Sequence, residues 1–458
     1  MMKELKMLAP LDPSFQPLAC ALALFAEDAA QKGGPRIALA VERHDGLVAV
    51  RHMQILPDGD DDCRTLTMVE RMVKSMLWVY GGFRVTVAGS QKVYDGIAAQ
   101  YRAGGARAFD ADFMSDVYEQ PFEVVYVPRT EDAPQCKEAA AAIGRHLDGC
   151  RIGFDAGGSD RKVSAVVDGK SVYSEEVVWF PKTTADPSYH YAGIVEAMKT
   201  AASHMPRVDA IGVSSAGVYV NNHTMKASLF LKVPQEQFST QVKDIYIRAA
   251  KEIGDVPLTV CNDGDVTALA GAMSLGEDGI LGIAMGTSEA GGYVDAHGNI
   301  TGWLNELAFV PCDLSPTAMQ DEWSGDIGCG VKYFSQDAVI KLAPAAGILL
   351  DENASPAEKL KVVQAELESG NPKARQIYET IGVYLGHTLA FYSQFYQINH
   401  VLLMGRVTSG EGGDLLLSKA KEVLAAEYPH LAMKVHLPDE KSRRVGQSVA
   451  AASLPVIG

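Results

Sequence analysis

Two glycine-rich turns contain the residues best suited to binding phosphate. The first is Asp155-Ala156-Gly157-Gly158-Ser159, between strand-like runs at 151–155 and 162–167. Its glycines let the backbone approach phosphate oxygens closely, and the Ser159 hydroxyl can donate to those oxygens. Lys162 can reach the same volume, and Asp155 can hold Mg²⁺, which prefers carboxylate and water ligands. A plain hairpin explains the same glycines, because Gly and Asp are frequent in turns.

The second turn, Gly286-Thr287-Ser288-Glu289-Ala290-Gly291-Gly292, lies between strand-like runs at 280–285 and 293–295. Two such hairpins on facing lobes would hold a polyphosphate from both sides. The chain has no GxxxxGK[ST] sequence, so neither turn is the phosphate loop that caps a helix. A plain hairpin is again the alternative.

Asn262-Asp263 follows a strand-like run at 258–261 and has the chemistry to activate an alcohol. A sugar hydroxyl is a poor nucleophile, so phosphoryl transfer to it benefits by about 10²–10⁴-fold from a carboxylate that takes its proton. Asp263 is the candidate base, and Asn262 would orient the sugar. The alternative is a helix cap, a position that favours Asn and Asp. We expect Asp265 to be that cap, which leaves Asp263 free.

Two further segments carry weaker signals. Glu306 sits among apolar residues in 302–307, where two sugar hydroxyls would be suitable partners, although an exposed loop acid explains it as well. Gly405-Arg406-Val407-Thr408-Ser409-Gly410 follows a strand-like run at 401–404. Its glycines would let a flat base or ribose lie against the backbone, and a flexible turn is the alternative.

The strands that must carry these residues are visible in the pattern. Several buried runs end in small or acidic residues, and α/β folds assemble a site at such strand ends. One run, 210–213, leads into Ser214-Ser215-Ala216-Gly217, so Ser215 and Gly217 join the candidate substrate-binding residues. The full set of runs is 151–155, 210–213, 258–261, 280–285 and 401–404.

The front of the chain has an α/β pattern of its own, without a phosphate loop. Asp45-Gly46 separates two β-rich runs and predicts a hairpin. Helical spacing at 66–79 and 93–101 alternates with strand-like runs at 83–87 and 122–127, and a linker follows at 128–134. We expect three domains, 1–148, 149–275 and 276–458.

Composition excludes several classes of protein. The 458 residues are 47% hydrophobic and 21% charged, which allows a sizeable core. The net charge is −16, from 41 Lys and Arg against 57 Asp and Glu, which argues against a nucleic acid partner. Seven cysteines without a CxxC pair are typical of a reduced compartment. No apolar run approaches the roughly 18 residues of a spanning helix, so we expect a cytoplasmic protein with no membrane partner.

In order and spacing, these segments resemble the actin-like ATPase superfamily, and within it the ROK family of bacterial sugar kinases and sugar-responsive repressors. The likeness spans about residues 150–455. The matching residues are Asp155, Gly157, Gly158, Ser159 and Lys162 for the first phosphate motif; Asn262 and Asp263 for the catalytic pair; Gly286, Thr287, Gly291 and Gly292 for the second phosphate motif; 405–410 for the adenosine segment; and 446–451 for the terminal helix.

Three departures from the family pattern stand out. Ser288 replaces a glycine of the second phosphate motif, and Ala308-Phe309 occupies the Gly-His place three residues after Glu306. The family's zinc cluster is reduced to Cys329. A structural zinc site needs four ligands, so we expect no structural zinc.

The resemblance implies two actin-like (ribonuclease H-like) α/β lobes with an interlobe cleft, preceded by an N-terminal α/β extension. The C-terminal helix would return to the first lobe. The order of elements in the extension suggests half of an actin-like lobe that lacks the phosphate turn. A homodimer is expected from the family alone.

The activity implied by the resemblance is ATP- and Mg²⁺-dependent phosphorylation of a sugar or polyol. Asp263 would be the base, with Asn262, Glu306, Ser215 and Gly217 at the acceptor and Asp155 at Mg²⁺. The nucleotide would contact Gly157, Gly158, Ser159, Lys162, Gly286, Thr287, Ser288, Gly405 and Arg406. The alternatives are a non-enzymatic sugar sensor or regulator on the same fold, and an ATPase that drives a partner's conformational change. A repressor is not expected, because the extension is neither basic nor a helix-turn-helix.

Overall fold

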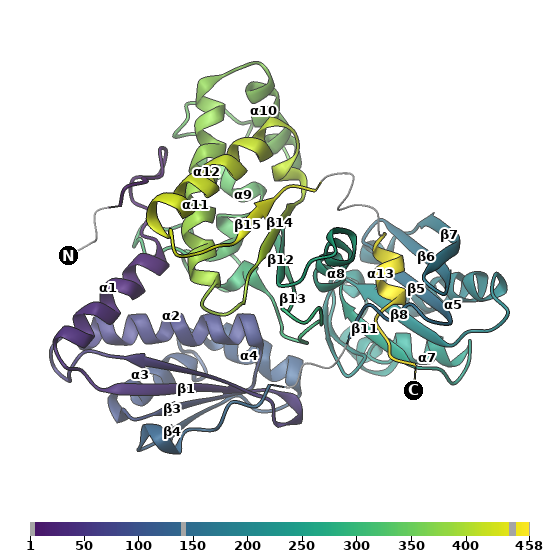
Figure 1. Cartoon of the computed structure of the whole chain (residues 1–458), viewed down its shortest axis with the longest axis horizontal. Coiled ribbons are helices and arrows are strands. Elements are labelled where there is room, and N and C mark those ends of the chain that lie inside the picture. The colour runs from purple at the N-terminus through teal and green to yellow at the C-terminus, as the bar shows by residue number, and fades with distance from the viewer. Residues whose placement is uncertain (1–4, 139–142, 439–445, 458) are drawn as a thin grey trace.

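Three bodies make up the chain, of which a computed structural model describes residues 5–138, 143–438 and 446–457. We call them the N-terminal unit, lobe 1 and lobe 2, each built around its own sheet. Figure 1 shows the N-terminal unit below lobe 2, with lobe 1 to the side of both. None of the helices in the described residues has the length and apolar character needed to cross a bilayer.

The N-terminal unit contains a four-stranded sheet in the order β2-β1-β3-β4. The hairpin predicted around Asp45-Gly46 is confirmed, since β1 and β2 pair antiparallel. The strands are β1 (Arg36–Glu42), β2 (Val48–Gln54), β3 (Arg84–Ala88) and β4 (Glu123–Val127), and the helices are α1 (Leu18–Gln31), α2 (Asp62–Tyr80), α3 (Gln91–Tyr101) and α4 (Ala108–Tyr118).

Strand direction separates this unit from an actin-like lobe. β1 pairs antiparallel with β3, whereas the corresponding central pair of lobe 1, β5 (Cys150–Ala156) with β8 (Ala210–Ser215), is parallel. The hypothesis that the extension is half of an actin-like lobe is therefore wrong. Element order alone does not fix the direction in which a third strand joins a hairpin.

Lobe 1 holds a five-stranded sheet in the order β11-β8-β5-β6-β7, in which β5, β8 and β11 run parallel. The predicted runs at 151–155, 162–167, 210–213 and 258–261 all form strands of this sheet. Its other elements are β6 (Asp160–Val167), β7 (Lys170–Val178), α5 (Pro187–Ser203), β9 (Val218–Val220), β10 (His223–Lys226), α6 (Gln235–Gln237), α7 (Ile245–Lys251) and β11 (Leu258–Asn262).

Lobe 2 holds a four-stranded sheet in the order β13-β12-β14-β15. Helix α8 (Asp263–Leu275) connects it to β11, the edge strand of lobe 1. The remaining elements are β12 (Ile280–Met285), β13 (Glu289–Val294), α9 (Gln336–Leu342), α10 (Pro356–Glu368), α11 (Pro372–Tyr392), β14 (His400–Met404), α12 (Glu411–Glu427), β15 (Lys434–His436) and α13 (Gln447–Ala452).

Helix α13 lies against the sheet of lobe 1 and against α8, although it follows the last strand of lobe 2 (Figure 1). Two glycines in neighbouring strands make this approach possible. A Cβ atom on Gly153 would lie 1.7 Å from the Ser448 carbonyl oxygen, and one on Gly212 would lie 1.7 Å from the Ala451 carbonyl oxygen. Any side chain at either position would push α13 off the sheet.

The N-terminal unit shares one continuous hydrophobic core with lobe 2, while lobe 1 has a core of its own. Six charged side chains meet at the boundary between these two bodies, five from the N-terminal unit and one, Asp326, from lobe 2. We call them the buried ion cluster. Lys74 is fully buried and lies 3.0 Å from Asp110 and 3.4 Å from Asp326 of lobe 2. The other pairs are Arg71 with Glu70 (2.6 Å) and Asp326 (2.9 Å), and Arg107 with Glu70 (2.6 Å) and Asp326 (2.9 Å).

Replacing Lys74 by Met tests how much this cluster holds the N-terminal unit to lobe 2. Burial opposes the charge on Lys74, but the neighbouring carboxylates outweigh it and raise its pKa. Removing the ammonium leaves carboxylates buried without their partner, which costs about 3–5 kcal/mol of unfolding free energy. Urea unfolding followed by tryptophan fluorescence measures the loss.

The matched control is Lys92→Met, which removes the half-exposed partner of Asp62 on the surface of the same unit. We expect little change, because surface ion pairs contribute little. Equal losses of stability in the two variants would show that the cluster does not brace the boundary.

Candidate functional site

The start of α8 places Asn262 and Asp263 at the junction of the two lobes. Asn262 caps the helix by accepting a hydrogen bond from the Gly264 N–H at 2.7 Å, and its Nδ2 donates to the Gly217 carbonyl at 2.7 Å. The prediction that Asp265 is the cap is wrong. The Asp265 carboxylate turns toward lobe 2, where it accepts from the Tyr293 N–H at 3.0 Å and from Asn305 at 2.9 Å.

Asp155 lies at the end of β5, close to Asp263. Its carboxylate accepts a hydrogen bond from Ser214 at 2.7 Å, and burial, together with the charge of Asp263, raises the pKa of Asp155 to about 6. Lys162 pairs with Asp155 across the β5–β6 hairpin and lowers this pKa in part. Gln447 of α13 donates to the Ser214 hydroxyl at 3.0 Å and to the Asp263 carbonyl at 3.1 Å. The returning helix thus supports both acids from behind.

The Asp263 side chain is mostly buried and keeps some exposed surface. Burial raises the pKa of Asp263, and the positive charge of Lys182 opposes that shift. Lys182 lies over the first glycine turn, since a Cβ atom on Gly158 would meet its Nζ at 2.8 Å. Sequence reasoning missed Lys182 because it follows β7, away from both glycine turns in the sequence.

Glu306 is held in place by the end of α2. The Glu306 N–H donates to the Trp78 carbonyl at 3.0 Å, and the Asn305 N–H donates to the Val79 carbonyl at 3.0 Å. Burial raises the pKa of the Glu306 carboxyl to about 7, and the charges of Asp263 and Asp265 add to the shift. The alternative of an exposed loop acid is therefore excluded.

Glu289 is a buried acid that the sequence analysis did not single out. Burial raises the pKa of its carboxyl to about 8, and the charge of Glu306 contributes. Tyr392 donates to Oε1 at 3.4 Å, while Oε2 has no hydrogen-bond partner among the described residues. It was missed because it was counted as part of a glycine loop.

The second glycine turn is shorter than predicted. Residues Gly286, Thr287 and Ser288 form the turn, and β13 already begins at Glu289. Gly291 and Gly292 are therefore strand residues, and the predicted bounds of the turn were wrong. A Cβ atom on Gly292 would lie 2.1 Å from the Gly264 carbonyl oxygen, so this glycine lets β13 approach the start of α8.

The remaining predicted residues fall in different surroundings. Thr287, Ser288, Gly158 and Ser159 are exposed at their turns, as are Gly405 and Arg406 after β14. Gly157 is partly buried in the first turn. Ser215 is fully buried, and its hydroxyl contacts those of Tyr219 (2.6 Å) and Tyr246 (2.8 Å). Ser215 therefore has no surface to offer a substrate, which corrects its assignment to the acceptor site.

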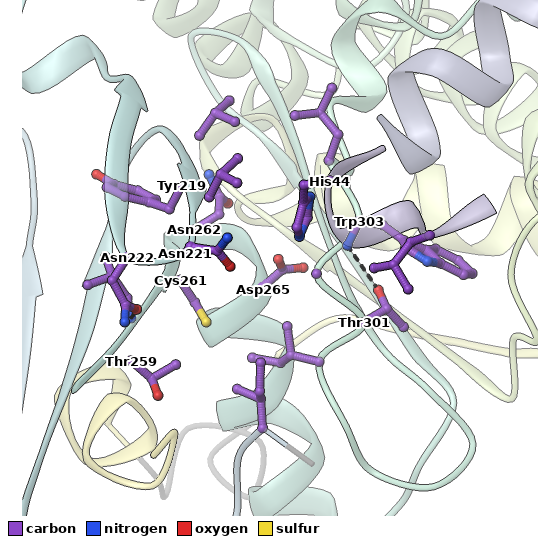
Figure 2. A pocket seen from close by; sticks show the side chains of 18 of the residues that line it. His44, Tyr219, Asn221, Asn222, Thr259, Cys261, Asn262, Asp265, Thr301 and Trp303 are labelled. Carbon is purple, nitrogen blue, oxygen red and sulfur yellow. Dashed lines mark hydrogen bonds between the residues drawn. The ribbon is translucent and has the colours of Figure 1, made fainter. Parts of the chain in front are cut away.

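A pocket of about 550 Å³ opens where the three bodies meet. Gly217, Asn262 and Asp265 line its floor, whereas Asp263 and Glu306 are not among its lining residues. Figure 2 shows Asp265 in the middle of the pocket, with Asn262 and Tyr219 to one side and His44 and Trp303 to the other. The pocket therefore begins at Asn262 and Asp265, at the start of α8, and extends toward the N-terminal unit.

Metal-binding chemistry is limited to single carboxylates in the part of the chain that the structure describes. No group of three or more His, Cys, Asp or Glu side chains there has the arrangement of a metal site. Asp155 precedes the first glycine turn and Asp160 follows it, and the charges of Asp160 and Asp263 both act on Asp155. One or two carboxylates with substrate phosphates are the usual ligands of a catalytic Mg²⁺.

No protein-family model and no curated protein sequence matches this chain. Several solved structures match it. A ROK hexokinase from Thermus thermophilus is 20% identical, covers 66% of this chain and 97% of its own, and has a TM-score of 0.51. A ROK family glucokinase from Streptomyces griseus, in complex with glucose and AMPPNP, is 20% identical with coverages of 66% and 98% and a TM-score of 0.45. A ROK family transcriptional regulator, a homologue of the E. coli MLC protein, is 16% identical with coverages of 67% and 79% and a TM-score of 0.49.

The similarity to the Thermus hexokinase shows the fold. Over about two thirds of its length the chain has the two-lobed α/β fold of that hexokinase, which confirms the fold class expected from the motifs. About a third of the chain lies outside the matched region.

Glu289→Gln is expected to make the protein more stable at alkaline pH and to change little at acidic pH. In the unfolded chain the carboxyl ionises near its ordinary pKa of 4.5, whereas the folded protein holds the proton up to about pH 8. The free energy of unfolding therefore falls as the pH rises between these two values. At about 1.4 kcal/mol per pKa unit, the total loss is a few kcal/mol. Glutamine carries no such penalty. Melting temperatures at about pH 5 and pH 9 measure the difference.

The exposed Glu368→Gln is the matched control, with no pH-dependent gain expected. A Glu289→Gln variant whose melting curve follows the wild type at both pH values would show that Glu289 is ionised or solvated in the folded protein.

Proposed function

We propose that the protein transfers the γ-phosphoryl group of ATP to a hydroxyl of a sugar or related polyol. The observation that carries the proposal is that Asp155, Asp263 and Glu306 lie together at the junction of the lobes. The charge of Asp263 raises the pKa of both other carboxyls. The ROK hexokinase fold agrees with this activity. Structural acids buried only for stability would be expected to carry charged partners, as those of the buried ion cluster do.

Asp263 is proposed as the general base. A base works best with a pKa near the working pH, and burial moves the pKa of Asp263 upward in that direction. The carboxylate would take the proton of the acceptor hydroxyl as its oxygen bonds to phosphorus. Asn262 and Glu306 would hold neighbouring hydroxyls of the same sugar. Gly217 would contribute through its carbonyl, which already fixes Asn262.

The nucleotide fits the two glycine turns. Gly157, Gly158 and Ser159 offer N–H groups and a hydroxyl beside a lysine, and Gly286, Thr287 and Ser288 offer a second exposed turn. Gly405 and Arg406 are exposed after β14 and would contact the adenosine. Mg²⁺, when bound, would neutralise phosphate charge, with Asp155 as its protein ligand. Use of ATP and a set of cysteines without a CxxC pair agree with a place in the cytoplasm.

Asp263→Asn is expected to reduce turnover by at least about 10²-fold while leaving sugar affinity within about two-fold, because the amide keeps the shape but cannot accept the proton. A coupled assay of ADP release across a sugar panel measures turnover, and calorimetry measures affinity. The control is Asp112→Asn at an exposed position of α4. Unchanged turnover in Asp263→Asn would remove the proposed base.

Lys182→Ala is expected to raise the KM for ATP by about ten-fold, since a charge-assisted hydrogen bond to phosphate contributes about 1.5–3 kcal/mol. The KM for the sugar should stay the same. Lys170→Ala, at the exposed start of β7, is the control for loss of a surface lysine. A rise in the sugar KM alone would place Lys182 at the acceptor instead of the nucleotide.

A sugar sensor on the same fold is the second candidate function. Ala308 and Phe309 stand where the family's Gly-His pair is expected, and the N-terminal unit is attached close to the sugar segment. Sugar-dependent shifts of melting temperature without ADP release from any sugar in the panel would support the sensor. ATP hydrolysis without an acceptor would support a motor ATPase instead.

A further inference from the structure

The pocket at the start of α8 has walls from all three bodies, including the N-terminal unit. His44 and Tyr118 come from that unit, Trp303 from the loop after β13, and Tyr219 and Asn221 from the β9–β10 hairpin of lobe 1 (Figure 2). From this arrangement we propose that the pocket binds a neutral carbohydrate of two rings. The inner ring would lie at Asn262, and the outer ring would lie between His44 and Trp303.

Aromatic side chains line opposite sides of the pocket, Trp303 on one and Tyr219 on the other. Trp303 packs edge-on against Tyr80, with ring centroids 4.7 Å apart, and stacks on Tyr293 at 5.7 Å. Its Nε1 donates to Glu138 of the N-terminal unit at 3.0 Å, so the indole has one orientation. The negative face of an aromatic ring attracts weakly positive C–H groups, which a sugar ring presents on its apolar face.

The N-terminal unit fixes this wall by a second contact. Arg43 is almost fully buried and donates to both Glu138 oxygens, at 2.8 and 2.5 Å. Glu138 in turn holds the Trp303 indole. The orientation of a lobe 2 side chain in the pocket is thus set by two residues of the extension.

Several polar groups of the pocket are suited to hydroxyls. Nδ1 of His44 is buried and has no hydrogen-bond partner among the described residues. Such an atom is costly unless something binds it. Asn221 is exposed at the opposite wall, and an amide can both donate to and accept from a hydroxyl. Asp265 presents a carboxyl at the floor, between these two walls.

The charges around the pocket favour a neutral ligand. Asp45 and Lys137 both lie at the rim, and the Lys137 ammonium donates to the Asp45 carbonyl at 3.3 Å. One acid and one base therefore offset each other there. The described residues that line the pocket include no arginine, the bidentate donor that usually recognises a phosphate or a carboxylate.

The dimensions favour more than one ring. The volume of about 550 Å³ lies within the range of about 300–1,000 Å³ for small-molecule sites, and a single hexose at Asn262 would leave the side near His44 empty. For the reaction of the bound sugar this inference rests on the proposed kinase function. Binding itself does not depend on it.

Calorimetry with the neutral disaccharides cellobiose, maltose, lactose and sucrose, beside glucose, galactose and fructose, tests the proposal. We expect at least one disaccharide to bind the wild-type protein about ten-fold or more tightly than its component monosaccharides. His44→Ala should remove most of this advantage and leave monosaccharide affinity within about two-fold, because only the outer ring reaches His44. His52→Ala, at an exposed position of β2 in the same unit, should leave both affinities unchanged.

Two results would overturn the inference: no disaccharide that binds more tightly than its monosaccharides, or a disaccharide preference that survives both His44→Ala and Trp303→Phe. ADP release measured on the same sugars separates this proposal from the proposed function. A disaccharide that binds through His44 without being phosphorylated would contradict the kinase and retain the pocket. Phosphorylation of monosaccharides, with no disaccharide that binds more tightly than its component monosaccharides, would retain the kinase and contradict the pocket.

Discussion

The pairing of buried charges between the N-terminal unit and lobe 2 is the constraint on which the site depends. Asp326 of lobe 2 lies within 3.4 Å of Arg71, Lys74 and Arg107, all from the N-terminal unit. An unpaired charge in such a place is very costly, so α2 has one allowed position against lobe 2. The last turn of α2 then receives the N–H groups of Asn305 and Glu306. A catalytic candidate is thus held by a part of the chain that contains none of the family motifs.

The acids at the lobe junction show the opposite arrangement. Asp265 and Glu289 are buried and Glu306 is partly buried, and removal from water raises the pKa of each carboxyl. Such groups reduce stability above their unfolded pKa, and proteins retain that cost mainly where chemistry needs it. In the buried ion cluster every acid has a cationic partner, whereas the acids at the lobe junction have few or none among the described residues. This difference distinguishes structural charges from those of the proposed site.

The sequence predicted the elements of the two lobes well and their tertiary contacts poorly. The runs before Asp155, Asn262 and Gly286 are short, apolar and bounded by glycine or acids, and each forms the expected strand. The exchanged roles of Asn262 and Asp265 could not be foreseen, because Asp265 finds its partners on β13 and in the loop after it. The antiparallel direction of β3 relative to β1 could not be predicted for a similar reason, because tertiary packing decides how these strands pair. Lys182 lies at the first glycine turn and His44 in the pocket only because the fold brings them there, and no sequence motif marks either residue.

The N-terminal unit touches the two lobes in very different ways. Toward lobe 1, the ion pairs that the described residues of this unit make lie at the surface: Asp116 with Lys226 and Glu119 with Lys243, both at 2.6 Å. Salt screens such pairs, whereas the buried contacts with lobe 2 are screened much less. If the two lobes move apart, we therefore expect the extension to stay with lobe 2 and to separate from lobe 1. The pocket has walls from both lobes, so its width would change with the angle between them. A ligand that fills the pocket would therefore limit how far the lobes can rotate.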